Sequence, residues 1–188
     1  MINERQLIRT MNGCYKKAGY RVGVVKSDDG TRLVICGGDW LVRMEPQAVS
    51  NDVKALVVLH TGELPGRAVL AKDKDGPQFL IAGELEKILR ETAETDEQME
   101  SAGQTPIQLR GLEIWQGDSG ECRLFEPALV NIFEEDDGLP DRRMSAQSLC
   151  LEGIGGAVYL HPAPGGSEDQ EQLRYLSGRR WVGTGGKE

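Results

Sequence analysis

Short apolar runs are the feature that most limits what this chain can fold into. The longest uninterrupted run of hydrophobic residues, at 55–59, has five residues, whereas a helix that crosses a membrane needs about 20. Turn-forming groups such as Asp28-Asp29-Gly30 and Gly117-Asp118-Ser119-Gly120 separate neighbouring runs. This pattern is typical of short strands and amphipathic helices. We therefore predict a globular α+β protein in which antiparallel β-hairpins pack with helices, and no association with a membrane.

The first half of the chain alternates between helical and extended patterns. Asn3 is suited to cap a helix, and Gly19 suits the position after its end. Glu45-Pro46 ends a later strand, because proline cannot continue the ladder. The predicted helices are 4–18, 50–60 and one around 85–89, and the predicted strands are 20–24, 33–36, 40–44, 68–71 and 79–81.

The second half repeats this order. Glu126-Pro127 matches Glu45-Pro46, and a Leu-Pro pair at 139–140 matches the one at 64–65. The offsets are 81 and 75 residues, so a duplication would need insertions and deletions. We predict two similar ββαββα halves, with one α+β domain lacking a repeat as the alternative. The predicted strands here are 112–115, 122–125, 148–151 and 157–160, and the predicted helices are 128–133 and one that begins with a capping box of Ser167 and Gln170.

A polar stretch at 91–105 marks the middle of the chain. It is acidic and has no aromatic residue, so we interpret it as an exposed helical extension or a linker. We place an N-terminal half at 1–100, a C-terminal half at 101–182 and a disordered tail at 183–188. The two halves are expected to fold as one unit or as two close subdomains.

Charge is distributed unevenly along the chain. The formal net charge is -8, but the first 60 residues carry +3 and the remainder carries -11. The acidic balance argues against unspecific binding to nucleic acid or to anionic membranes. Weak binding of nucleic acid stays open for the first 60 residues, whose basic cluster comprises Arg5, Arg9, Lys16, Lys17 and Arg21.

The N-terminus and the cysteines indicate a cytoplasmic protein. Residues 1–10 include Glu4, Arg5 and Arg9 and lack the apolar centre of a secretory signal. The cysteines form no Cys-x-x-Cys pair, so we expect neither a metal nor another cofactor. We expect buried, unreactive thiols at Cys14, Cys36, Cys122 and Cys150.

The residues suited to catalysis are few and follow no known motif. His60 is predicted on the inward face of a helix, and His161 in an exposed loop. The glycine-rich segment at 153–156 joins two predicted strands, so it predicts a hairpin turn and no phosphate site. We expect no catalytic residue. The alternative is a small enzyme whose site is assembled from His60, His161, Cys122 and the acidic run at 134–137.

Two tryptophans and the acidic run are the candidate partner-binding residues. If Ile114 faces the core, Trp115 faces the opposite side of the sheet, where another element covers it or a partner contacts it. Trp181 lies near the C-terminus, where it is either docked or an exposed anchor. The acidic run lacks the spacing of a calcium loop and is either a solvated loop or a patch that faces a partner. The candidates are Trp115, Trp181, Glu134, Glu135, Asp136 and Asp137.

These patterns favour a non-enzymatic protein that binds a protein partner and regulates or inhibits it. One version is an acidic inhibitor that occupies the basic nucleic-acid groove of an enzyme, since complementary charge speeds association. The small enzyme and the nucleic-acid-binding protein are the alternatives. The sequence defines neither the partner nor the oligomeric state.

Overall fold

A computed structural model describes residues 1–27, 30–64, 66, 69–71, 78–79, 87, 98–135 and 141–181. It confirms the α+β class, with helices packed on antiparallel strands. The helices are α1 (Glu4–Lys17), α2 (Asn51–Thr61), α4 (Pro127–Val130) and α5 (Ser167–Ser177). The strands are β1 (Tyr20–Ser27), β2 (Gly30–Cys36), β3 (Trp40–Met44), β4 (Val69–Ala71), β5 (Gln78–Phe79), β6 (Glu100–Leu109), β7 (Leu112–Gly117), β8 (Cys122–Phe125), β9 (Asp141–Met144), β10 (Leu149–Gly153) and β11 (Gly156–Leu160). No helix in the described part of the chain is long and apolar enough to cross a membrane.

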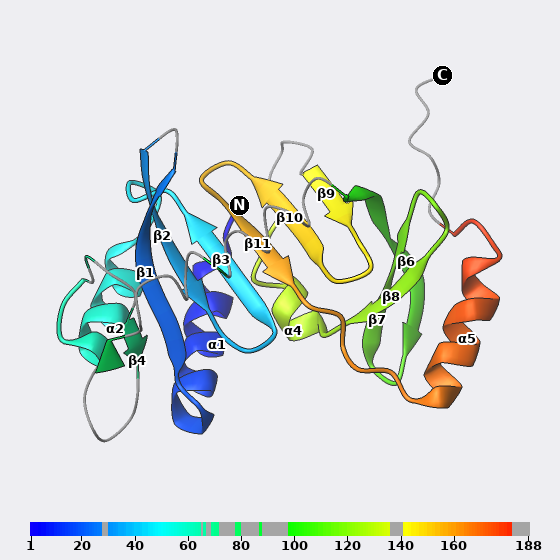
Figure 1. Ribbon diagram of the computed structural model, residues 1–188, viewed down its shortest axis with the longest axis horizontal. Coiled ribbons are helices and arrows are strands. Elements are labelled where there is room, and N and C mark those ends of the chain that lie inside the picture. The colour runs from blue at the N-terminus through cyan, green and yellow to red at the C-terminus, as the bar shows by residue number, and fades with distance from the viewer. Residues whose placement is uncertain are drawn as a thin grey trace.

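The strands form one continuous hydrogen-bonded order, β5-β4-β1-β2-β3-β11-β10-β9-β6-β7-β8, in which every pair is antiparallel. β6 connects two parts of this strand order. Its residues Glu100 and Ser101 pair with β9, and from Ala102 onward it pairs with β7. The sheet runs along the longest axis of the molecule, with α1 and α2 beside β1–β3 at one end and α5 beside β6–β8 at the other (Figure 1).

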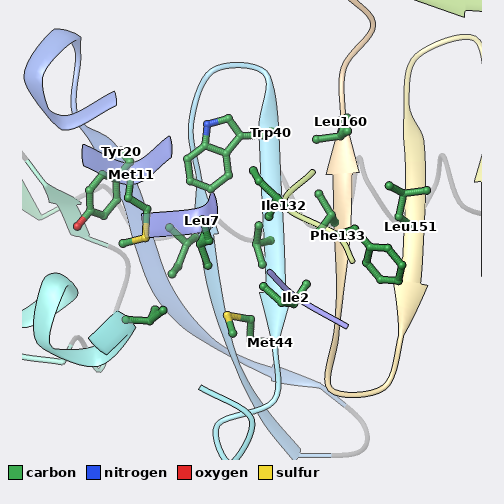
Figure 2. Close-up of a cluster of buried hydrophobic side chains, with 14 of the residues drawn as sticks. Ile2, Leu7, Met11, Tyr20, Trp40, Met44, Ile132, Phe133, Leu151 and Leu160 are labelled. Atoms are coloured by element: carbon green, nitrogen blue, oxygen red, sulfur yellow. The ribbon is translucent and has the colours of Figure 1, made fainter. Parts of the chain in front are cut away.

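The main core lies between α1, α2, α4 and one face of the sheet. Leu7 and Met11 of α1 are fully buried and lie close to Trp40 and Tyr20 (Figure 2). The same cluster takes side chains from both halves of the chain, among them Val22, Val42, Val57, Trp115, Phe125, Ile132, Phe133, Leu151 and Leu160. The two predicted halves therefore share one core, and the boundary near residue 100 stays a prediction.

The predicted N-terminal helix is confirmed together with its caps. The Asn3 side chain accepts a hydrogen bond from the Gln6 backbone N–H at 3.1 Å, and Gly19 follows the helix with a φ of 74°. Ile2 forms a β-bridge with Phe133, so the chain enters α1 from a fixed position beside the second half.

Four sequence-based predictions need correction. Residues 100–105 belong to β6 and are neither linker nor helix; the strand was missed because its buried positions, Gly103 and Thr105, are not apolar. β9 was missed because its residues 141–143 are charged. The last helix begins after Gly166, whose backbone N–H donates to Asp169 Oδ2 at 2.8 Å, so Ser167 is its first residue and not its cap. The predicted helix at 128–133 is shorter and begins one residue earlier, as α4.

The two halves follow the same pairing order in part. After three consecutive strands and a helix, β4 returns to pair with β1, and β9 returns to pair with β6. The elements nevertheless differ, since α2 has 11 residues and α4 has 4. Internal duplication therefore stays a prediction. Of the predicted helix at 85–89, only Lys87 is described, and it is helical; the Leu-Pro pair at 139–140 and the tail at 183–188 lie outside the described residues.

We predict that Gly156→Ala destabilises the protein by about 1–3 kcal/mol, because the new methyl group overpacks the contact between β11 and β3. A Cβ atom at this position would lie 2.5 Å from the Arg43 backbone carbonyl oxygen, which belongs to a paired strand and cannot move alone. Gly38→Ala is the matched control, since a Cβ atom there meets nothing within 4 Å. Urea unfolding of the two variants measures the difference, and equal stability would contradict close packing at this contact.

Candidate protein-binding surface

Helices α1 and α2 lie side by side and run in the same direction. At their starts, the Ser50 backbone N–H donates to Glu4 Oε1 at 2.8 Å. At their ends, the rings of Tyr15 and His60 stack with centroids 3.6 Å apart and planes 5° apart. The two contacts are separated by nearly equal numbers of residues in each helix, so the helices stay adjacent over about 15 Å at a rise of 1.5 Å per residue.

The outer face of α1 is basic. Arg5, Arg9 and Lys16 are exposed and lie on the side of the helix opposite the buried Leu7 and Met11. Within the described residues, none of the three forms an ion pair. We call Arg5, Arg9 and Lys16 the basic ridge.

The outer face of α2 is apolar after its first turn, in which Asn51 and Asp52 are exposed. Leu59 is 75% exposed and Val58 is 39% exposed, and Ala55 is exposed beside them at helical spacing. The opposite face of the helix is buried through Val53 and Val57. A helix that is apolar all round is normally covered on every side. We call Ala55, Val58 and Leu59 the apolar ridge, and it is the largest departure of this helix from an ordinary surface helix.

Sequence reasoning missed the apolar ridge although a signal for it was present. The five-residue apolar run at 55–59 is too long for one face of a helix with 3.6 residues per turn. Some of its side chains must therefore point away from the core. The predicted inward stripe of this helix accounts for only some of these residues, and the exposed ones had no predicted role.

A polar cluster joins the C-terminal ends of α1 and α2 to the sheet. The Tyr20 hydroxyl lies 2.6 Å from His60 Nδ1, and Tyr15 stacks on the same imidazole. Burial lowers the pKa of His60, and burial together with the neighbouring Tyr15 raises the pKa of Tyr20. Both groups are therefore neutral at pH 7, and the contact is a hydrogen bond between uncharged partners.

The tryptophan candidates are both occupied by contacts within the chain. Trp115 is 3% exposed, and its indole Nε1–H donates to Glu113 Oε2 at 3.3 Å. The side of β7 that carries it is thus covered by the main core, while Ile114 on the other side packs toward α5. Trp181 is docked, with its indole N–H donating to the Leu176 carbonyl oxygen at 3.0 Å. Neither tryptophan forms an open anchor.

The acidic run is exposed at Glu134 and Glu135, while Asp136 and Asp137 lie outside the described residues. Glu135 forms an ion pair with Arg142, which offsets part of the negative charge. Among the described residues, no group of three histidine, cysteine or acidic side chains is placed to hold a metal ion.

The candidate catalytic residues have separate surroundings. His60 contacts Tyr15 and Tyr20, whereas His161 is exposed and its Nδ1 lies 3.0 Å from the Gln147 carbonyl oxygen. All four cysteines are free, and burial raises the pKa of the Cys36 thiol to about 11. Burial also raises the pKa of Cys122, in spite of its contacts with Ser177 and Gln116. These thiols are poor nucleophiles at neutral pH.

Comparisons of this chain with protein-family models, curated proteins and solved structures gave no match.

We predict that His60 makes stability depend on pH in a defined window. Because folding lowers its pKa from the ordinary value of 6.5, the unfolded chain binds a proton more readily than the folded chain. The free energy of unfolding therefore falls as the pH drops below about 6.5, until the lowered pKa is reached. His60→Gln removes this part of the pH dependence.

Thermal or urea unfolding at several pH values between about 5 and 8 measures the effect. His161→Gln is the control, since that histidine is exposed and contacts only a backbone carbonyl oxygen. The same pH slope in the His60→Gln variant and in the unmodified chain would show that the Tyr15–His60–Tyr20 cluster does not discriminate between the two protonation states.

Proposed function

We propose that this chain is a non-enzymatic protein that binds a protein partner through the outer faces of α1 and α2, and thereby regulates or inhibits it. The observation that carries the proposal is the apolar ridge on α2. Leu59 and Val58 are exposed side by side on a helix whose inner face is already buried. Contiguous exposed apolar residues rimmed by charge are a mark of interaction sites.

The energetics of this surface support binding. Full burial of a Leu or Val side chain stabilises a complex by about 1.5–3 kcal/mol. The cost of ordering the surface is low, because α2 is held at its start by the Ser50–Glu4 hydrogen bond and at its end by the His60 cluster. A surface that is already ordered before binding loses little conformational entropy in the complex.

The version with an acidic inhibitor has weaker support. It needs an uncompensated negative patch at 134–137, and Glu135 is already paired with Arg142. Glu134 remains exposed, so an acidic contact at this site is a second way to hold a basic partner. The two versions differ in which residues the partner covers.

We predict that Leu59→Glu abolishes binding of the physiological partner. A charge at this position cannot be buried against an apolar surface without a partner of its own. Tyr175→Glu is the matched control: Tyr175 is 61% exposed on α5, at the opposite end of the sheet from α1 and α2 (Figure 1). Both substitutions are at exposed positions, so both variants are expected to fold, which circular dichroism and thermal unfolding verify.

The measurement is quantitative affinity purification from the native cell with the unmodified chain and both variants. A protein retained by the unmodified chain and by Tyr175→Glu, but reduced at least about tenfold with Leu59→Glu, supports the proposal. The interaction is then repeated with the purified partner. If every co-purifying protein is retained equally by all three chains, the outer face of α2 is not the binding site. Loss with Glu134→Gln and Glu135→Gln, and not with Leu59→Glu, would favour the acidic version.

A further inference from the structure

Resting on the proposed function, we infer the chemical class of the partner: an amphipathic helix whose apolar stripe packs on the apolar ridge of α2 and whose acidic side chains reach the basic ridge of α1. The inference follows from the presence of two different ridges on two adjacent helices. One ridge is apolar, through Ala55, Val58 and Leu59, and the other is cationic.

The spacing of the ridges suits a helical partner. On α1, the step from Arg5 to Arg9 is one turn, and the step from Arg5 to Lys16 is three turns, or about 16 Å. On α2, Ala55, Val58 and Leu59 lie at the separations that form one face of a helix. Helices pack with their axes about 8–10 Å apart. A helix laid along α2 on the side of α1 therefore brings its flank within reach of the long arginine and lysine side chains.

The signs of the charges define the partner's polar face. The basic ridge has no ion-pair partner among the described residues, so it offers three cations for charge-assisted hydrogen bonds with carboxylates. The chain outside the first 60 residues carries -11, so an acidic helix is repelled by most of the molecule and attracted here. This combination of attraction at one site and repulsion elsewhere fixes the position and register of an acidic partner.

Other kinds of binding partner would contact only part of this surface favourably. A nucleic acid would use the basic ridge and leave Leu59 and Val58 exposed to water. A second copy of the chain, related by a two-fold axis through α2, would bring two identical surfaces together. The two basic ridges would then flank one interface, where their like charges repel each other. An acidic amphipathic helix uses both ridges at once, which is the mode by which many helical segments are recognised.

The test uses the intact chain and designed peptides as probes. The first probe is a fluorescently labelled helix of about 18 residues, or five turns, built from Leu, Ala and Glu with a leucine stripe on one face. The second has Lys in place of every Glu, and the third is a scrambled sequence of the first, which has no stripe. A labelled single-stranded oligonucleotide is the fourth. Fluorescence anisotropy measures the dissociation constant of each.

We expect the acidic amphipathic peptide to bind at least about tenfold more tightly than the Lys peptide and the scrambled peptide. Leu59→Glu and the double variant Arg5→Glu, Arg9→Glu are each expected to weaken this binding by about tenfold or more, because each removes one of the two kinds of contact. Arg174→Glu is the matched charge control, since Arg174 is exposed on α5, and it should leave binding unchanged. Charge reversal is preferable to salt titration, because salt also screens the repulsion from the acidic remainder.

Other results would overturn the inference in distinguishable ways. Equal binding of the acidic and Lys peptides would remove the role of the basic ridge. Oligonucleotide binding that is lost with Arg5→Glu, Arg9→Glu but not with Leu59→Glu would identify a nucleic-acid surface. A dimer in analytical ultracentrifugation that Leu59→Glu dissociates would identify a second copy as the occupant. If the native partner is lost with Leu59→Glu while no acidic peptide binds, the proposed function stands and only the inferred class of partner fails.

Discussion

The pairing of β3 with β11 is the contact on which the rest of the fold depends. Among the described strands, it is the only pair that joins β1–β5 to β6–β11. It closes a loop of more than 100 residues between Met44 and Gly156, so its entropic cost must be offset by the core that it assembles. On one face it aligns Trp40 and Leu160 in the main core. On the other, Glu152 of β10 accepts a hydrogen bond from Arg43 of β3 across β11, and a second one from Arg143 of the adjacent β9.

This pairing also explains which parts of the fold could be predicted from the sequence. Helix α1 and the hairpins β1–β2, β7–β8 and β10–β11 are specified by neighbouring residues: a cap, a period or a turn. The pairing of β3 with β11 is not specified by neighbouring residues, because no residue in either strand indicates the other strand as its partner. β6 and β9 were missed for a related reason. Both pair with neighbours at both edges, and Met144 is the only buried apolar side chain in the two strands, so a search for apolar alternation passes over them.

The candidate site shows the same division between local features, which the sequence predicts, and tertiary contacts, which it does not. Sequence reasoning placed His60 inward and predicted a basic cluster, of which Arg5, Arg9 and Lys16 share the outer face of α1, while Arg21 lies on β1. It left two possibilities open for Trp115, because whether the second face of β7 is covered depends on the main core, whose side chains come from distant parts of the chain. The apolar ridge could have been found from the run at 55–59 alone. The run alone does not predict that α1 lies beside α2, because the contact between the two helices is tertiary.

The position of the basic ridge gives the net charge of the chain a different meaning. A total of -8 suggests an acidic surface suited to basic partners. However, the acidic residues near 134–141 partly pair with arginines of the same region, as Glu135 does with Arg142 and Asp141 with Arg143. Arg5, Arg9 and Lys16 are not neutralised in this way within the described residues, and their helix lies beside α2, which carries the exposed Leu59. Local, unpaired charge next to apolar surface determines recognition more directly than the total does, because distant charges are screened beyond about 10 Å at ordinary ionic strength. The surface proposed to bind a partner therefore carries a charge opposite in sign to the net charge of the whole chain.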